Sequence, residues 1–201
     1  PPGPYTMADL GQDALDLYGA LDVKAAHFCG LSMGGMVGMW LAANAPDRVN
    51  RLVLCNTAAR LGPPQLWDAR IAAVQLGGMP AIVSAVVARW FTAAFMERPS
   101  ATLDHMRQVL SDTSAEGYCA CCEAIRDMDQ RDSLERIQAP TLVIAGELDT
   151  ASPPADGRFL AERIARARYI ELAAAHLTNI EAPEAFTQAV VGFLTDGAGV
   201  A

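Results

Sequence analysis

Two kinds of hydrophobic pattern alternate along the chain, one at helical spacing and one in short continuous runs. Helical spacing is clearest in the opening segment, at Leu10, Ala14, Leu17 and Leu21. It predicts a helix over residues 6–21, with Thr6 as its cap and Asp9 in its first turn. Runs of strand length lie at 25–29, 51–55, 140–146 and 167–172. Strands that alternate with helices predict an α/β fold, a mostly parallel sheet with helices on both faces.

The pattern changes between residues 59 and 133, where helical segments follow one another without a strand run. Pro63 and Pro64 open this stretch, and the helical pattern extends from Gln65 to about Asp132. Helices inserted between two strands of one sheet predict a cap that covers one edge of the sheet and excludes water. The predicted parts are a first core segment over 1–58, a helical cap over 59–133 and a second core segment over 134–201.

A glycine-framed serine follows the first predicted strand. Residues 26–38 combine a short strand, the sequence Gly30-Leu31-Ser32-Met33-Gly34 and a helix rich in small residues. This arrangement is typical of a nucleophile elbow, a strained turn that exposes the serine hydroxyl and needs small residues on either side. The Met33 N–H would point toward a developing oxyanion. The structural alternative is that Gly30 and Gly34 only let the helix pack on the sheet, with Ser32 as its N-cap.

A carboxylate that could serve this serine follows a later strand. A serine hydroxyl is a weak nucleophile unless a base removes its proton and a carboxylate orients that base. Asp149 lies in the loop after the run 140–146. The carboxyl ends of parallel strands form the edge where sites are built, and Ser32 lies at the same edge. Glu147 is the competing carboxylate, but it follows the strand directly, and the position of Asp149 is more favourable.

The general base can be sought by elimination, because the chain has three histidines. His176 lies in a loop after the strand run 167–172 and before a helix that begins near Pro183. His27 lies inside the first predicted strand and would point into a sheet face, and His105 lies in a charged helical stretch. Both therefore read as structural. His176 is the predicted base, with a surface loop histidine as the alternative reading.

The chain order Ser32, Asp149, His176 is the order found in alpha/beta-hydrolases. Four stretches resemble the beta-ketoadipate (3-oxoadipate) enol-lactonases of bacterial aromatic-acid breakdown, at 28–36, 51–58, 117–129 and 175–186. The resemblance implies an alpha/beta-hydrolase fold and the opening of 3-oxoadipate enol-lactone to 3-oxoadipate through an acyl-enzyme, with no cofactor. It assigns nucleophile, acid and base to Ser32, Asp149 and His176, and one oxyanion donor to Met33.

The resemblance also sets an expectation for the start of the chain. An alpha/beta-hydrolase opens with several strands and a loop whose backbone N–H supplies the second oxyanion donor. This chain begins at Pro1-Pro2-Gly3-Pro4, without an initiator methionine, in what should be the connector before the first helix. We therefore expect a chain truncated at its N-terminus that lacks these strands and the second donor. The strand over 25–29 would then be an exposed apolar edge, and the chain weakly active.

Several residues of the predicted cap are candidates for substrate contact: Trp67, Arg70, Arg89, Trp90 and Arg126. Most aromatic and arginine side chains in such helices are structural or solvated. An enol-lactone of this kind carries a free carboxylate, which needs a cationic partner. We expect Arg89 or Arg126 to provide it.

Other functions remain open on the residues alone. A carboxylesterase, a carbon–carbon bond hydrolase and a perhydrolase all use such a triad on this fold. A dehalogenase of the same fold would have an aspartate in place of Ser32. A protein that binds a small molecule without turning it over is an alternative of another class.

Composition narrows the class of partner. The chain has 201 residues, 52% of them hydrophobic, and a formal net charge of −8. Such a charge disfavours nucleic acid and anionic membranes, and leaves a small molecule as the expected partner. Five cysteines cannot all pair within one chain, so reduced thiols and a cytoplasmic location are expected. No Cys/His spacing suggests a metal site, and Cys29 and Cys55 read as small core residues.

Overall fold

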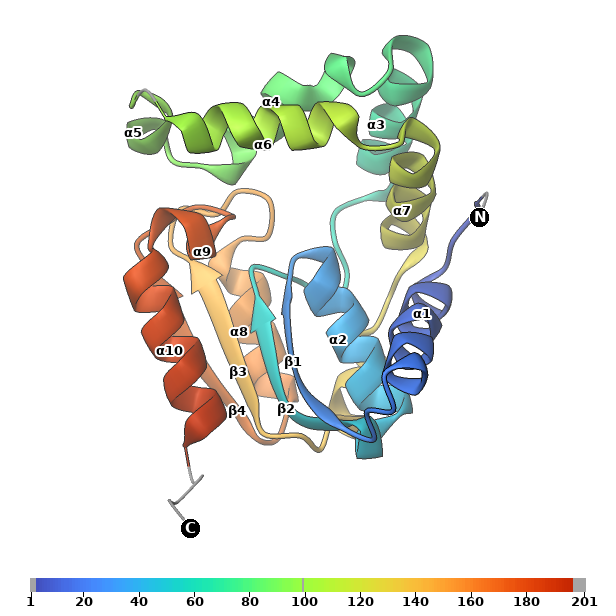
Figure 1. The fold of residues 1–201 in the computed structure, drawn as a ribbon, viewed down its shortest axis with the longest axis vertical. Coiled ribbons are helices and arrows are strands. Elements are labelled where there is room, and N and C mark those ends of the chain that lie inside the picture. Colours follow the sequence, from blue (N-terminus) through green and yellow to red (C-terminus); the bar gives the residue numbers. More distant parts are fainter. Residues whose placement is uncertain (1–2, 99, 197–201) are drawn as a thin grey trace.

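The computed structural model describes residues 3–98 and 100–196. Its centre is a four-stranded parallel sheet in the order β1-β2-β3-β4, which confirms the predicted sheet (Figure 1). The strands are β1 (Ala26–Leu31), β2 (Val49–Cys55), β3 (Thr141–Gly146) and β4 (Ala167–Leu172). Pro1 and Pro2, where the sequence predicts a connector, lie outside the described residues.

The register brings the carboxyl ends of the strands to one edge of the sheet. Leu31 at the end of β1 pairs with Cys55 at the end of β2, and Cys55 pairs with Ile144 of β3. Gly146, the last residue of β3, pairs with Leu172, the last residue of β4. The loops that follow the four strands therefore begin side by side.

Helices cover both faces of the sheet. Alternate residues of β2 point to opposite faces, as in any strand. Leu52 and Leu54 pack in one cluster with α2 (Met33–Asn44) and α8 (Pro154–Arg163), while Val53 and Cys55 pack in another with Phe193 of α10 (Pro183–Thr195). Helix α1 (Met7–Ala20) packs on the outside of α2. Three short helices complete this core: η1 (Pro46–Arg48), η2 (Arg131–Arg136) and α9 (Thr178–Glu181).

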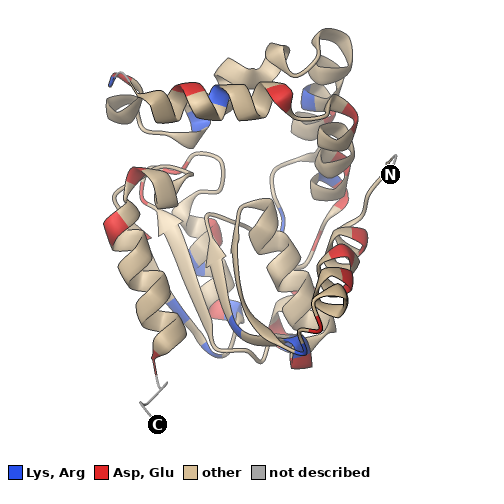
Figure 2. Ribbon diagram, viewed as in Figure 1, with Lys and Arg blue, Asp and Glu red and all other residues tan. Residues whose placement is uncertain are grey.

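The first helix begins where the sequence predicts. The Asp9 N–H donates to the Thr6 hydroxyl at 3.2 Å, and the Thr6 N–H donates to the Asp9 carboxylate at 2.7 Å. This reciprocal capping box pairs two backbone donors at the start of α1. Figure 2 shows acidic positions gathered along α1.

Five helices form a layer over the carboxyl edge of the sheet (Figure 1). They are α3 (Pro64–Gly77), α4 (Pro80–Trp90), α5 (Ala93–Met96), α6 (Ala101–Asp112) and α7 (Ala115–Asp127). We call them the cap. Its own apolar cluster includes Val74, Val87, Phe91, Leu103 and Leu110, all buried. Because the cap packs around this separate cluster, it can be held over the sheet without filling the space beneath it.

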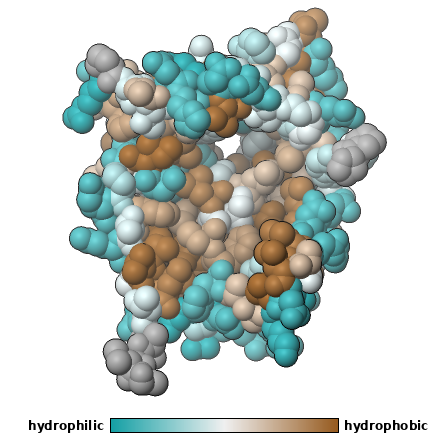
Figure 3. All heavy atoms as spheres, in the orientation of Figure 1, coloured by the Kyte–Doolittle hydropathy of each residue, from teal (hydrophilic) through white to brown (hydrophobic). Residues whose placement is uncertain are grey.

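The first strand lies at an edge of the described sheet, as expected, and one expectation for its residues is wrong. β1 is an edge strand of the described sheet, so its side chains are less covered than those of β2. Cys29, expected in the core, is exposed, whereas Cys55 is buried as predicted. His27 lies in β1, as expected, and its side chain is exposed. Figure 3 shows apolar surface on the face of the molecule where β1 lies, over α10 and over α1 with α2.

Candidate active site

Ser32 lies at the turn between β1 and α2 in a backbone conformation that is rare outside glycine. Its φ is 54° and its ψ is −117°. Such a conformation costs about 1–3 kcal/mol and persists only where the surroundings hold it. Here the Ser32 N–H donates to the carbonyl of Cys55 at 2.9 Å, and the Thr57 hydroxyl donates to the Ser32 carbonyl at 2.7 Å. The end of β2 therefore holds the strained turn that presents the Ser32 hydroxyl.

The glycines around Ser32 differ in what they permit. A Cβ on Gly30 would lie 2.2 Å from the carbonyl oxygen of Gly34, so the turn requires glycine there, as predicted. A Cβ on Gly34 would meet nothing within 4 Å, so the expectation that Gly34 must be small is wrong. The close approach is made by the backbone of Gly34, not by its side-chain position. Gly35 is the constrained neighbour, because its Cβ would lie 2.7 Å from Thr57 Cγ2.

Asp149 is buried in the loop between β3 and α8, with 4% of its surface exposed. Its Oδ1 accepts the N–H groups of Ala151 at 2.7 Å and Ser152 at 3.1 Å. Its Oδ2 accepts the Ser152 hydroxyl at 2.8 Å. Glu147, the competing carboxylate, is exposed. The geometry therefore favours Asp149 over Glu147 as the acid.

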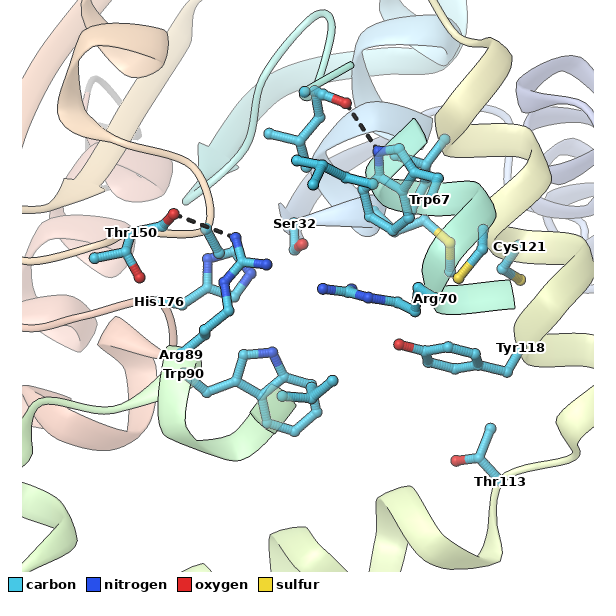
Figure 4. A pocket seen from close by; sticks show the side chains of 18 of the residues that line it. Ser32, Trp67, Arg70, Arg89, Trp90, Thr113, Tyr118, Cys121, Thr150 and His176 are labelled. Carbon is cyan, nitrogen blue, oxygen red and sulfur yellow. Dashed lines mark hydrogen bonds between the residues drawn. The ribbon is translucent and has the colours of Figure 1, made fainter. Parts of the chain in front are cut away.

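His176 lies after β4 and is also buried, with 4% of its surface exposed. Its Nδ1 lies 2.8 Å from Asp149 Oδ2 and 3.4 Å from the Ser152 hydroxyl. With Nδ1 directed at the carboxylate, Nε2 is the ring nitrogen left to serve Ser32. Ser32 and His176 line the same cavity (Figure 4). His105 is exposed on α6, away from this arrangement.

The charge on Asp149 is stabilised by its hydrogen bonds. Burial alone would raise the pKa of this carboxyl group, because it disfavours the ionised form. Hydrogen bonds from His176, Asn56 and the Ser152 backbone, together with the charge interaction with His176, outweigh burial and lower the pKa below its ordinary value of 3.8. Asp149 is therefore an anion at neutral pH and orients His176 as a charged acceptor.

Asn56 is a component of this site that the sequence reasoning missed. It follows β2 directly, has a φ of 47° and is 1% exposed. Its Nδ2 donates to Asp149 Oδ2 at 3.0 Å and to the Ala175 carbonyl at 3.2 Å, and its Oδ1 accepts the Thr178 hydroxyl at 2.7 Å. One amide thus joins the loops that carry Asp149 and His176. A polar residue directly after a buried strand was the available signal, since Ser32 occupies the same place after β1.

A cavity of about 530 Å³ lies between the cap and the sheet, with Ser32 and His176 on its floor. Figure 3 shows an opening beneath the cap. Four of the five residues predicted as candidates for substrate contact line it, namely Trp67, Arg70, Arg89 and Trp90, and so does Met33. Figure 4 shows Trp67 and Trp90 on opposite sides of the space in front of Ser32. This volume suits a small organic molecule.

The arginines of the cap differ in whether they are free to bind an anion. Arg126, one of the two expected carboxylate partners, is not among the residues that line the cavity. It pairs with Asp68 at 2.9 Å and with Asp127 at 2.8 Å, so the structure does not support this expectation. Arg89 does line the cavity and donates to the Thr150 carbonyl at 3.2 Å.

Arg70 is the other cationic side chain of the cavity wall. Its guanidinium carbon lies 4.9 Å from the centre of the Trp67 ring. Figure 4 shows it extending between Trp67 and Tyr118 toward Ser32. No carboxylate within the described residues lies at ion-pair distance from it. Arg70 can therefore accept an anionic ligand without breaking an existing ion pair.

The cavity also contains two cysteines that are poor competitors for Ser32. Cys121 and Cys122 of α7 both line it. Burial raises the pKa of the Cys122 thiol to about 12 and also raises the pKa of Cys121. Because the thiolate is the reactive form, these thiols are weak nucleophiles at neutral pH. Within the described ranges, no three His, Cys, Asp or Glu side chains are grouped so that they could hold a metal ion. No helix of the described chain is long and apolar enough to cross a membrane.

Comparison with known proteins identifies the family. Residues 1–183 match the family model described as the alpha/beta hydrolase fold. The chain is 43% identical over 190 residues to 3-oxoadipate enol-lactonase 2 of Acinetobacter baylyi, an alignment that covers 94% of this chain and 71% of that protein. The crystal structure of the enol-lactonase from Burkholderia xenovorans is 49% identical, with a TM-score of 0.96 over 98% of this chain and 75% of that one.

A more distant solved structure extends the comparison beyond the lactonases. The malate-bound thermophilic esterase from Thermogutta terrifontis is 29% identical, with a TM-score of 0.89 over 96% of this chain and 74% of that chain. Of these three proteins, the two enol-lactonases are the more similar in sequence. The chain therefore belongs to the alpha/beta hydrolase family and is a hydrolytic enzyme of the enol-lactonase type.

Proposed function

We propose that this enzyme opens 3-oxoadipate enol-lactone, or a close enol-lactone analogue, to the free acid during aromatic-acid breakdown. The observation that carries the chemistry is the buried 2.8 Å contact between His176 Nδ1 and Asp149 Oδ2 beside the strained Ser32 turn. The choice of substrate is supported by the similarity to the enol-lactonases of Acinetobacter baylyi and Burkholderia xenovorans.

The proposed mechanism uses groups of this chain and water. His176 Nε2 removes the Ser32 proton as Oγ attacks the lactone carbonyl, and Asp149 stabilises the imidazolium that forms. The tetrahedral oxyanion accepts a hydrogen bond from the Met33 N–H at the start of α2, where the helix dipole also favours negative charge. Collapse of this intermediate breaks the ring C–O bond and expels the enol oxygen, which takes the proton from His176. A water molecule deprotonated by His176 then cleaves the acyl-enzyme and frees Ser32.

The residues that line the cavity favour a small substrate that carries a carboxylate. Trp67 and Trp90 offer flat apolar walls for a ring, and Arg70 and Arg89 offer positive charge on the same walls. An arginine that meets a carboxylate forms charge-assisted hydrogen bonds, which are stronger than neutral ones. We assign the carboxylate of the substrate to Arg70, with Arg89 as the alternative, because Arg126 is already engaged by two aspartates.

The test compares two substrates on the same preparation. We expect kcat/KM for 3-oxoadipate enol-lactone to exceed that for p-nitrophenyl acetate, a neutral aryl ester, and both to vanish in Ser32→Ala. A preference for the aryl ester would contradict the lactone assignment. It would favour a carboxylesterase instead, the alternative to which the similarity with the Thermogutta terrifontis enzyme points.

A further inference from the structure

The carboxylate of Glu181 joins the loop of His176 to the cap. Glu181 is the last residue of α9, five positions after His176. Its Oε2 accepts the N–H of Ala175, the residue before His176, at 3.0 Å. The same carboxylate accepts the N–H of Thr92 at 3.3 Å on each oxygen, and it also accepts the Thr92 hydroxyl. Thr92 belongs to the cap, between α4 and α5.

A second set of contacts runs beside the first. The N–H of Leu177 donates to the carbonyl of Trp90 at 3.0 Å. Leu177 and Ile180 pack against the apolar cluster of the cap, which includes Phe91. The cap therefore contacts the core at several points along two segments, residues 90–92 and residues 175–181. Trp90 belongs to the cavity wall, and the loop on the other side carries His176.

The Glu181 carboxylate is half-buried and is held by N–H and O–H donors. Within the described chain, no Lys, Arg or His side chain lies at ion-pair distance from it. Hydrogen bonds to an ionised acceptor are roughly twice as strong as neutral ones, and they fix the geometry of their donors. A neutral side chain at this position would lose much of that hold on both Ala175 and Thr92.

We propose that Glu181 is a positioning residue that sets the distance and orientation between the His176 loop and the cavity wall formed by Arg89 and Trp90. The Ala175 bond orients the base, and the Thr92 bonds place the wall that a substrate contacts. The inference rests on the proposed function for the identity of the substrate. The contacts of Glu181 do not depend on that identity. Misplacement of reacting groups by about 1 Å can cost on the order of a hundredfold in rate, so a shift at this junction is measurable.

The contacts of Glu181 with Ala175 and with Thr92 predict different kinetic effects. Glu181→Ala removes both, and we expect kcat to fall about tenfold and KM to rise several-fold. Thr92→Val removes the hydroxyl bond to Glu181 and the 3.2 Å N-cap bond that the same hydroxyl accepts from the Phe95 N–H, but it leaves the Ala175 contact in place. We therefore expect KM to rise while kcat stays within about twofold. Thr92→Ser keeps the hydroxyl and should restore KM. In the double variant, the KM effects should be less than additive, because both changes disrupt one junction.

The control is Glu184→Ala, which removes an exposed carboxylate three residues further on, in the first turn of α10. Kinetics are measured with p-nitrophenyl acetate as well as the enol-lactone and are corrected for the fraction of enzyme labelled by a fluorophosphonate. Equal kinetics in Glu181→Ala and Glu184→Ala, or a loss in Glu181→Ala explained by a smaller labelled fraction, would overturn the proposal.

Hydrogen exchange tests the junction without any turnover. We expect the amides of residues 90–92 and 175–177 to exchange at least tenfold faster in Glu181→Ala than in Glu184→Ala, with α1 and α2 unchanged. Unchanged exchange at both segments would also overturn the inference. An enzyme that cleaves the aryl ester but not the lactone would refute the proposed substrate, while these exchange rates would still decide the role of Glu181.

Discussion

Asn56 donates a 3.0 Å hydrogen bond to the Asp149 oxygen that also lies 2.8 Å from His176 Nδ1. Both side chains are buried, and they come from the ends of neighbouring strands, β2 and β3. The Asn56 amide therefore donates a hydrogen bond to the Asp149 oxygen that orients the base. An amide keeps its protons at every pH of interest, so this donor is not lost by titration. Asn56 therefore influences the charge state of the Asp149–His176 pair as well as its packing.

Asn56→Asp tests that role with almost no change of shape. The new carboxylate would still accept the Thr178 hydroxyl, but it would face Asp149 as a second anion. Two carboxylates that share a buried site raise the pKa of one of them. A carboxyl group whose pKa is raised in the folded state contributes stability that is present below its unfolded pKa, about 4. This contribution is lost as the pH rises through the folded-state pKa.

We therefore expect urea unfolding to show a deficit of Asn56→Asp relative to wild type that grows between about pH 4 and pH 8. Thr141→Val is the control, because Thr141 is equally buried, lies at the start of β3 and donates its hydroxyl to the Ala139 carbonyl. A deficit that is the same at both pH values in Asn56→Asp would argue against the proposed interaction.

The lowered pKa of Asp149 predicts acid sensitivity of the fold. A carboxyl group whose folded pKa lies below its unfolded value contributes stability that is present above the unfolded value and is lost as the pH falls through the folded one. For Asp149 this loss begins near pH 4 and continues below it, because its ordinary pKa is 3.8. Asp149→Asn should be less stable than wild type at pH 7, and the gap in free energy of unfolding should narrow below about pH 4. A constant gap from pH 7 to pH 3 would contradict this explanation.

The glycines of the turn predict opposite outcomes for the same substitution. Gly30→Ala forces a Cβ to within 2.2 Å of the Gly34 carbonyl oxygen, so backbone must move. We expect a loss of about 3 kcal/mol or more in stability, with little activity left in what still folds. Gly34→Ala meets open space and replaces glycine in the first turn of a helix, so stability should be unchanged or higher by up to about 1 kcal/mol. Thermal unfolding of the two variants distinguishes them, and equal losses would refute the steric argument.

Two arginines of the cap should differ in their effect on KM. Arg70→Met removes a cavity-wall cation, and we expect kcat/KM for the enol-lactone to fall about tenfold to a hundredfold, mainly through KM. The neutral aryl ester should be affected less than threefold. Arg126→Met removes the ion pairs with Asp68 and Asp127, which lie outside the cavity lining. It should leave both KM values unchanged, at a cost of about 1 kcal/mol or less in stability. An equal rise of both KM values in Arg70→Met would show that Arg70 acts by packing alone.

The sequence could predict the parallel sheet and the residues at its carboxyl edge because each of these depends on local pattern. Ser32, Asp149 and His176 each follow a strand run, and parallel strands bring such positions together. Asn56 follows a strand in the same way, but an amide has no catalytic chemistry of its own and was passed over. Its hydrogen bonds to two distant loops become visible only in three dimensions.

Other features depended on contacts that spacing does not encode. The elbow motif indicates that small residues are needed, but not which atoms approach, so Gly34 was expected to be constrained where Gly35 is. Arg126 and Arg70 look alike in sequence, and only the fold places Asp68 beside one and the cavity beside the other. Cys29 was expected in the core because it lies in an apolar run, although the same strand was expected to be an exposed edge; β1 is an edge strand and Cys29 is exposed.

The most direct measurement is the site and rate of fluorophosphonate labelling, located by peptide mass spectrometry. We predict a single adduct on Ser32, no adduct in Ser32→Ala, and labelling slowed by at least a hundredfold in His176→Ala but not in His105→Ala. His105 is an exposed histidine outside the site and is the matched control. An adduct on another residue, or equal labelling rates in His176→Ala and wild type, would contradict the assignment of Ser32 as a nucleophile activated by the His176–Asp149 pair.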